Sequence, residues 1–317
     1  MALAHPFRER LRLPVIAAPM FLVTGPDLVV ACCRQGISCA VPSLNARTSD
    51  GFAAWLREID ERCRRAEQDT QRPCAPFGVN LIVHQTNPRL ASDLQHVIEA
   101  RVPYVVTSLG AVRDIVARIH DYGGVVLHDV INVRHAEKAI EAGVDGIIAV
   151  AAGAGGHAGT INPFALVGEL RPIVGERMLA LAGSISTGQD IAAAIAARAD
   201  IAYVGTRFIA TEESLAAPDY KTMVTSAASK DIVYTSKISG VNANFLAASI
   251  TASGLDLATL EPTPGMDLAH EAKAWSSIWS AGHGVGGFDT SLPVAQLVDE
   301  LESGFNEART RLAAWSS

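Results

Sequence analysis

The 317-residue sequence is 49% hydrophobic and 19% charged, a composition that allows one large globular domain or two ordinary ones. Lys and Arg total 26 against 33 for Asp and Glu, so the net charge of −7 argues against a nucleic-acid-binding protein. No apolar run reaches the roughly 20 residues of a membrane-spanning helix.

The five cysteines follow no regular spacing, and their odd number favours a reducing compartment over a disulfide framework. The segment from Met1 to Arg12 carries charges and lacks the apolar stretch of a secretory signal. No Cys-x-x-Cys pair occurs and no histidine pair has zinc-ligand spacing, so we expect no metal site. These features predict a cytoplasmic protein without a membrane segment.

Short apolar runs alternate with segments of helical periodicity between residues 15 and 204. Eight runs predict strands: Val15–Ala18, Ser38–Val41, Phe77–Ile82, Tyr104–Thr107, Val125–His128, Gly146–Val150, Leu179–Ala182 and Ile201–Val204. Seven segments predict helices: Pro26–Gln35, Phe52–Glu67, Leu90–Ala100, Ala111–Tyr122, Val133–Ala142, Pro163–Ile173 and Gln189–Arg198. Gly36, Gly123 and Gly143 directly follow three of these helices, at the position where a left-handed residue ends a helix.

The alternation predicts parallel strands joined by helical crossovers. Two architectures satisfy it, a closed (β/α)8 barrel and an open doubly wound sheet. We expect the (β/α)8 TIM barrel because eight units occupy about 190 residues without a long central crossover. The turn after the first strand, Ala17–Thr24, also lacks the glycine motif of a dinucleotide-binding sheet.

The pattern changes after Thr206. Residues from Glu212 to Ser280 show helical stretches without clear strand alternation, and a final helix is expected at Leu292–Ala314. We therefore expect a barrel at residues 1–211, a helical addition near the barrel mouth at residues 212–283 that covers the substrate, and a C-terminal segment at residues 284–317 whose helix returns to the barrel.

Glycines and hydroxyl residues follow the last two predicted strands. Gly183 and Ser184 come after the seventh strand, and Gly205 and Thr206 come after the eighth. In such barrels the active site forms at the carboxyl ends of the strands, and these two turns often bind phosphate. We expect a phosphate group here, although each glycine taken alone is equally explained by a tight turn.

His157 lies in the turn after the sixth strand, among Gly153, Gly155, Gly156 and Gly159. Such small neighbours leave room for a flat ligand against the backbone, with one imidazole facing it. Because histidine is the usual group for proton transfer near neutral pH, we expect His157 to be catalytic. The alternative is a loop histidine that hydrogen-bonds locally.

Other strand ends give weaker signals. Met20 can cover a ring face or fill the core, Asn80 can bond a heterocycle edge or cap a turn, and His128 is a ligand candidate or a buried structural histidine. His283 lies in a second glycine-rich stretch that could close over the site.

These segments together resemble the nitronate monooxygenase family, formerly called 2-nitropropane dioxygenases. The matches recur in order over the barrel and continue weakly to Trp279–Gly282: Pro14–Met20, Phe77–Leu81, Ala142–Asp145, Ala154–Gly159, Ala182–Ser184 and Gly205–Phe208. The resemblance implies a flavin mononucleotide (FMN) cofactor whose binding residues are Ala18, Pro19, Met20, Asn80, His128, Gly156, Gly183, Ser184, Gly205 and Thr206. It also implies that His157 faces the substrate, as a general base or as a stabiliser of the anionic nitronate.

The family oxidises alkyl nitronates with molecular oxygen to carbonyl compounds and nitrite, so a nitronate or nitroalkane and O₂ are the expected partners; a homodimer is left open. The same scaffold serves NADH:quinone reductases and enoyl-thioester reductases, so an NAD(P)H-dependent reductase is the alternative. A flavin-binding module without turnover is the third reading.

One residue departs from the family pattern. Some relatives place a lysine directly after the strand-five histidine, where this chain has Asp129. A carboxylate pointing inward would disfavour a reduced, anionic flavin, so we expect Asp129 to turn away or to orient His128.

Overall fold

The computed structural model describes residues 5–7, 9–110, 112–261, 275 and 277–315. Eight parallel strands close into a barrel in the order β1-β2-β3-β4-β5-β6-β8-β9, with β9 pairing to β1. Their bounds are β1 (Val15–Ala17), β2 (Ser38–Pro42), β3 (Phe77–Ile82), β4 (Tyr104–Ser108), β5 (Val125–Val130), β6 (Gly146–Val150), β8 (Met178–Ala182) and β9 (Ile201–Val204). The predicted (β/α)8 barrel is confirmed.

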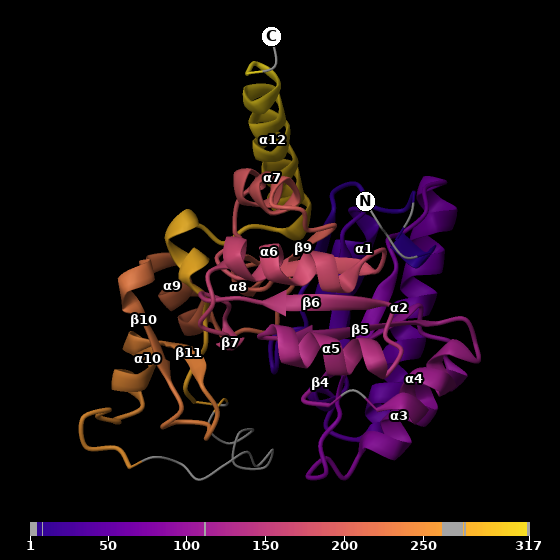
Figure 1. The fold of residues 1–317 in the computed structure, drawn as a ribbon, viewed down its shortest axis with the longest axis horizontal. Helices are drawn as coiled ribbons and strands as arrows, with labels where there is room; N and C mark the ends of the chain where they lie inside the picture. The colour runs from indigo at the N-terminus through magenta and orange to yellow at the C-terminus, as the bar shows by residue number, and fades with distance from the viewer. Residues whose placement is uncertain (1–4, 8, 111, 262–274, 276, 316–317) are drawn as a thin grey trace.

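The helices that connect successive barrel strands surround the barrel (Figure 1). They are α1 (Pro26–Arg34), α2 (Ser49–Thr70), α3 (Leu90–Glu99), α4 (Arg113–His120), α5 (Val133–Glu141), α6 (Pro163–Val174) and α7 (Gly188–Ala196). Among these helices α2, predicted at Phe52–Glu67, differs most from the prediction. It begins three residues earlier, where the Thr48 side chain accepts a hydrogen bond from Gly51 N, and it ends three residues later. Residue 111, the predicted start of α4, lies outside the described residues.

The strand β5 extends two residues beyond its predicted end. Asp129 and Val130 continue the ladder opposite Ile148 and Ala149 of β6. His128 and Asp129 are therefore held inside a rigid strand at the barrel mouth, because strand pairing fixes the backbone that carries them.

The barrel interior is filled by side chains, of which Tyr104 is the largest. Its ring lies where Gly78 on β3 leaves space, since a Cβ on Gly78 would be 2.3 Å from the ring. The Ser38 hydroxyl donates its proton to Pro76 O at 2.7 Å, so the Tyr104 hydroxyl donates to Ser38 Oγ at 2.9 Å and the buried phenol is paired. Packing at this end leaves the other end of the barrel, at the strand termini, open for a site.

The segment at residues 212–283 is not purely helical, which corrects the sequence prediction. Helices α9 (Pro218–Ser226) and α10 (Ala247–Ala252) accompany the strands β10 (Ile232–Thr235) and β11 (Ala243–Leu246). β11 pairs antiparallel with β10 and with β7 (Gly156–His157), a two-residue strand that follows β6. The addition lies at the end of the barrel toward which β6 points (Figure 1). Residues 262–274 and 276 of this segment lie outside the described residues.

The chain then returns to the barrel. After the short α8 (Thr206–Ile209) and the addition, helix α12 (Val294–Ala313) packs against α7. Four 3-10 turns complete the described elements: η1 (His5–Phe7), η2 (Ser43–Asn45), η3 (Ser229–Asp231) and η4 (His283–Gly287). Within the described ranges, no helix has both the length and the apolar character needed to cross a membrane.

Candidate active site

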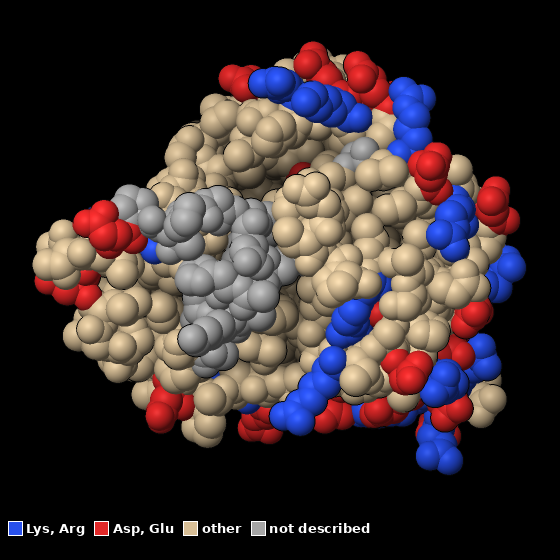
Figure 2. All heavy atoms as spheres, turned by 90° about the horizontal axis from the view of Figure 1, so that it is seen from below, with Lys and Arg blue, Asp and Glu red and all other residues tan. Residues whose placement is uncertain are grey.

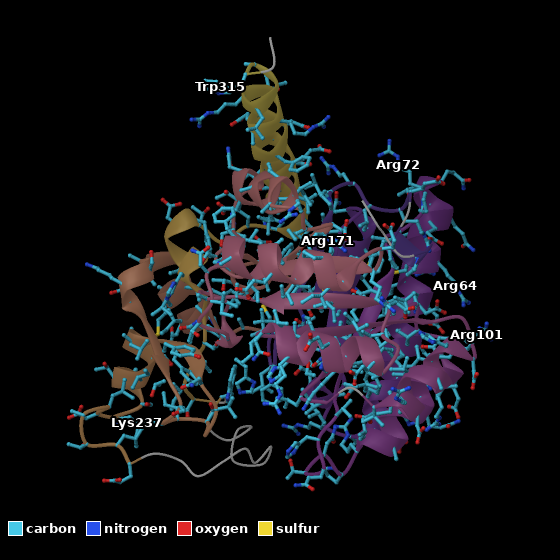
Figure 3. All side chains as sticks on the ribbon, viewed as in Figure 1. Arg64, Arg72, Arg101, Arg171, Lys237 and Trp315 are labelled. Atoms are coloured by element: carbon cyan, nitrogen blue, oxygen red, sulfur yellow. The ribbon has the colours of Figure 1, made fainter. Side chains whose placement is uncertain are left out.

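A cavity of about 1160 Å³ opens at the carboxyl ends of the barrel strands and is walled on one side by the addition. Every residue that the sequence singled out for catalysis or cofactor binding lines it: Ala18, Pro19, Met20, Asn80, His128, Gly156, His157, Gly183, Ser184, Gly205 and Thr206. Figure 2 shows that the molecular surface is hollowed on the face seen there. Exposed basic side chains such as Arg64, Arg72 and Arg101 point outward on the side away from the addition (Figure 3).

The turns after β6 and β8 and the loop before η4 meet at one carbonyl group. Gly153 O accepts hydrogen bonds from Ser184 N at 3.3 Å and from His283 N at 2.9 Å. The Thr206 hydroxyl accepts from Gly282 N at 2.8 Å, which ties the turn after β9 to the same loop. These bonds fix the relative positions of the segments that the sequence predicts to bind phosphate.

The arrangement at these turns fits an anionic group. Gly205 lies in the cavity wall, and a Cβ there would make ordinary contacts with Ala18 and Met20 at 3.7 Å or more. The buried Ser186 hydroxyl, also in the wall, has no hydrogen-bond partner among the residues that the structure describes. A buried hydroxyl without a partner is costly, and a bound phosphate would satisfy it.

His157 is held by the addition rather than by a free loop. It lies on β7 opposite Ala243 of β11, and its ring makes an edge contact with Trp275 at a centroid distance of 5.6 Å. Trp275 in turn packs edge-on against Phe245 of β11. Gly156 has a φ of +71°, and a Cβ there would be 3.2 Å from the Trp275 ring, so both the turn and the close packing favour glycine.

The wall formed by β3, β4 and β5 carries a polar cluster. Asn80 Nδ2 donates to Ser108 Oγ at 2.8 Å, and Ser108 Oγ donates to Asp129 Oδ2 at 2.5 Å. Burial raises the pKa of Asp129, while the charge of His128 and the hydrogen bond from Ser108 act in the opposite direction. The expectation that Asp129 turns away or orients His128 is wrong, because Asp129 lines the cavity and bonds Ser108.

His128 has a different partner. Its Nδ1 lies 2.8 Å from the Thr107 hydroxyl, and burial lowers its pKa even though the nearby Asp129 charge acts to raise it. The neutral ring is therefore the favoured form near pH 7. A neutral imidazole next to a cofactor donates or accepts a hydrogen bond without adding a charge.

The turn after β1 is held from behind by Asn45. Its Nδ2 donates to Met20 O at 3.0 Å and to Thr24 O at 2.8 Å, while its Oδ1 accepts from Leu22 N. Sequence analysis did not single out Asn45, because its role depends on a contact across 25 residues. Trp275, Ser108 and Tyr203, which line the cavity, were missed as well. Of these residues only Ser108 could have been found from the sequence, because it is a polar residue at the carboxyl end of a barrel strand, β4.

The His283 side chain does not line the cavity, although its neighbours Ala281 and Gly284 do. Its Nδ1 would lie 3.2 Å from a Cβ placed on Gly153, so it packs behind the turn that leads to β7. The glycine-rich stretch therefore contributes backbone to the cavity wall.

Comparison with known proteins agrees with this geometry. The family model described as nitronate monooxygenase matches residues 8–304. A nitronate monooxygenase from Paraburkholderia phytofirmans is 29% identical over 96% of this chain and 95% of that protein. The structure of a nitroalkane oxidase from Streptomyces ansochromogenes superposes with a TM-score of 0.81 at 25% identity, over 96% of this chain and 99% of that chain.

FabK from Thermotoga maritima, with a TM-score of 0.78 at 24% identity over 96% of both chains, shows the shared fold. The barrel, its cavity and these relatives define a flavin-dependent oxidoreductase of the (β/α)8 class. Within that class, the chain belongs to the nitronate monooxygenase family.

Proposed function

We propose that the protein oxidises alkyl nitronates with molecular oxygen, forming a carbonyl compound and nitrite, with FMN as its cofactor. The observation that carries this proposal is the placement of His157 in the wall of a largely apolar cavity, near the turns suited to a phosphate. An apolar cavity accepts the alkyl part of a nitronate, and an imidazole can pair with its charged nitro group.

The residues present fit the cofactor. Gly183, Ser184, Gly205 and Thr206 would hold the FMN phosphate, with the unpartnered Ser186 hydroxyl as a further donor. The ring system would lie among Ala18, Pro19, Met20, Asn80, His128 and Gly156. When bound, the flavin supplies the electron transfer between substrate and oxygen.

His157 is the proposed catalytic residue. Its imidazole holds or donates a proton at the substrate, and the packing of Trp275 restricts the ring to one region of the cavity. The addition at residues 212–283 excludes water from the substrate and supplies β11, which carries β7 through strand pairing. We also infer a cytoplasmic location, since all five cysteines are buried free thiols.

The first experiment is an anaerobic absorbance titration of the FMN-loaded protein with propane 2-nitronate. The nitronate alone should reduce the flavin. In His157→Ala the rate of flavin reduction should fall by at least about 100-fold while FMN binding stays intact. His84→Ala, outside the cavity, is the matched control. An unchanged rate in His157→Ala would remove the catalytic role.

A second function has one observation in its favour. The cavity lining includes Lys138, whose ammonium group suits a phosphate of a nicotinamide dinucleotide. This feature supports an NAD(P)H-dependent reductase of a quinone or an enoyl thioester. Parallel titrations with NADH and NADPH decide between the two functions. If NADH or NADPH reduces the flavin and the nitronate does not, the protein is a reductase and the proposal of nitronate oxidation is wrong.

A further inference from the structure

Three neighbouring strands each place a polar side chain on the same wall of the cavity. Asn80 on β3, Ser108 on β4 and Asp129 on β5 form a continuous hydrogen-bonded row. The Ser108–Asp129 distance of 2.5 Å is in the range of a hydroxyl that donates to a carboxylate.

The donor and the acceptor of each hydrogen bond in this row follow from the groups that take part in it. Asn80 Nδ2 also lies 3.2 Å from Val106 O, which can only accept, so the nitrogen and not the oxygen of the carboxamide faces β4. Ser108 accepts from that nitrogen and has a single proton, which therefore goes to Asp129. Among the described residues, no hydrogen bond reaches Asn80 Oδ1, and this oxygen is left for a ligand.

Asp129 is the only acidic residue among the described residues that line the cavity. Burial and, to a smaller extent, the Asp129 charge raise the pKa of Tyr203 on β9, which also lines the cavity. A carboxyl group in this position costs free energy to bury. A carboxyl group that only filled space here would bring this cost without a benefit. Asp129 instead accepts the last hydrogen bond of the row, from Ser108.

We propose that Asp129 is a positioning residue for the cofactor: acting through Ser108, it holds the Asn80 carboxamide with its oxygen toward the cavity, as the acceptor for an N–H group of the flavin ring. The inference uses the flavin site and is independent of the nitronate reaction.

The test measures FMN dissociation constants of the apoprotein and its variants by quenching of flavin fluorescence. Ser108→Ala and Asp129→Ala should each weaken FMN binding about tenfold, since each leaves Asn80 without its support. Asp129→Asn should stay within about threefold of the unmodified protein, because its amide oxygen still accepts the Ser108 proton. Ser92→Ala, the same change on the exposed face of α3, should have no effect.

A double-mutant cycle separates this role from general damage to the site. The combined Ser108→Ala and Asp129→Ala variant should bind FMN no more weakly than either single variant, because both act through one row. Additive losses would overturn the proposal, as would unchanged binding in Ser108→Ala. If Asp129→Ala does not fold, the contrast between Ser108→Ala and Asp129→Asn decides alone.

No outcome of this test depends on nitronate. An enzyme that fails to oxidise nitronates can still show the Ser108 and Asp129 effects, and a nitronate-oxidising enzyme can fail to show them. The two proposals therefore stand or fall separately.

Discussion

Single residues at the mouth of the barrel are fixed by contacts from several segments at once. Gly153 has a φ of +82°, and its carbonyl holds the turn after β8 and the loop before η4 together. A Cβ there would lie 2.2 Å from Ser184 Oγ and 3.2 Å from His283 Nδ1. Glycine is therefore favoured at this position for two reasons: other residues are strained at this φ, and a side chain would not fit in the space.

Gly153→Ala should lower the free energy of unfolding by about 2 kcal/mol and weaken FMN binding, because alanine is strained at this φ and the added methyl group displaces the Ser184 side chain. Urea unfolding of the apoprotein and FMN titration measure the two effects. Gly168→Ala is the matched control, since a Cβ at this position in helix α6 meets nothing within 4 Å. Equal behaviour of the two variants would contradict the packing argument.

The lowered pKa of His128 predicts a pH dependence of stability. The ordinary value is 6.5, and burial makes the folded state release this proton more readily than the unfolded chain. Between the lowered pKa and about 6.5 the unfolded chain binds more protons, so stability rises with pH and is lost as pH falls through this window.

Urea unfolding of the apoprotein at pH 7.5 and pH 5.5 should therefore show lower stability at pH 5.5. The loss should be smaller in His128→Gln, which cannot gain that proton. The half-buried His84→Gln is the control, because His84 is not among the groups that shift the pKa of His128, and it should behave as the unmodified protein. A His128→Gln variant with an undiminished loss would assign the effect to other groups.

At the scale of elements, helices α7 and α12 approach one another closely because glycine stands at the contact. A Cβ on Gly188 would lie 2.1 Å from Leu301 O and 2.3 Å from Phe305 N, both backbone atoms of α12. Backbone atoms cannot turn aside as a side chain does, so one helix must shift.

Gly188→Ala should lower the free energy of unfolding by about 2 kcal/mol through this overpacking. The shift in the urea midpoint at constant slope measures it. Gly168→Ala again supplies the same chemical change without a contact. A midpoint equal to that of the control would show that α12 moves without cost.

The strands of the barrel were predictable as elements, whereas the small sheet was not. β3, β6 and β9 have the bounds that their apolar runs predict. β7 has two residues, and its partner β11 begins at Ala243, far along the chain. A strand of that length leaves no periodicity in the sequence, since its pairing is decided entirely by the neighbour.

At the scale of the whole molecule, the sequence by itself determined the barrel and the residues at its mouth. Eight buried strands joined by helices have essentially one closed solution, and it carries every strand end to the same face. Residues placed after those strands therefore meet, and the predicted cofactor residues all line one cavity.

Only the tertiary structure decided how that cavity is finished. In the folded chain Trp275 packs against His157, and Asp129 lines the cavity. Asn80 donates a hydrogen bond to Ser108, which donates to Asp129. These contacts join residues on different strands or far apart along the chain. The physical reason is that a periodic pattern records which face of an element is buried, whereas the direction of a polar side chain depends on partners that only the closed barrel and its addition bring near.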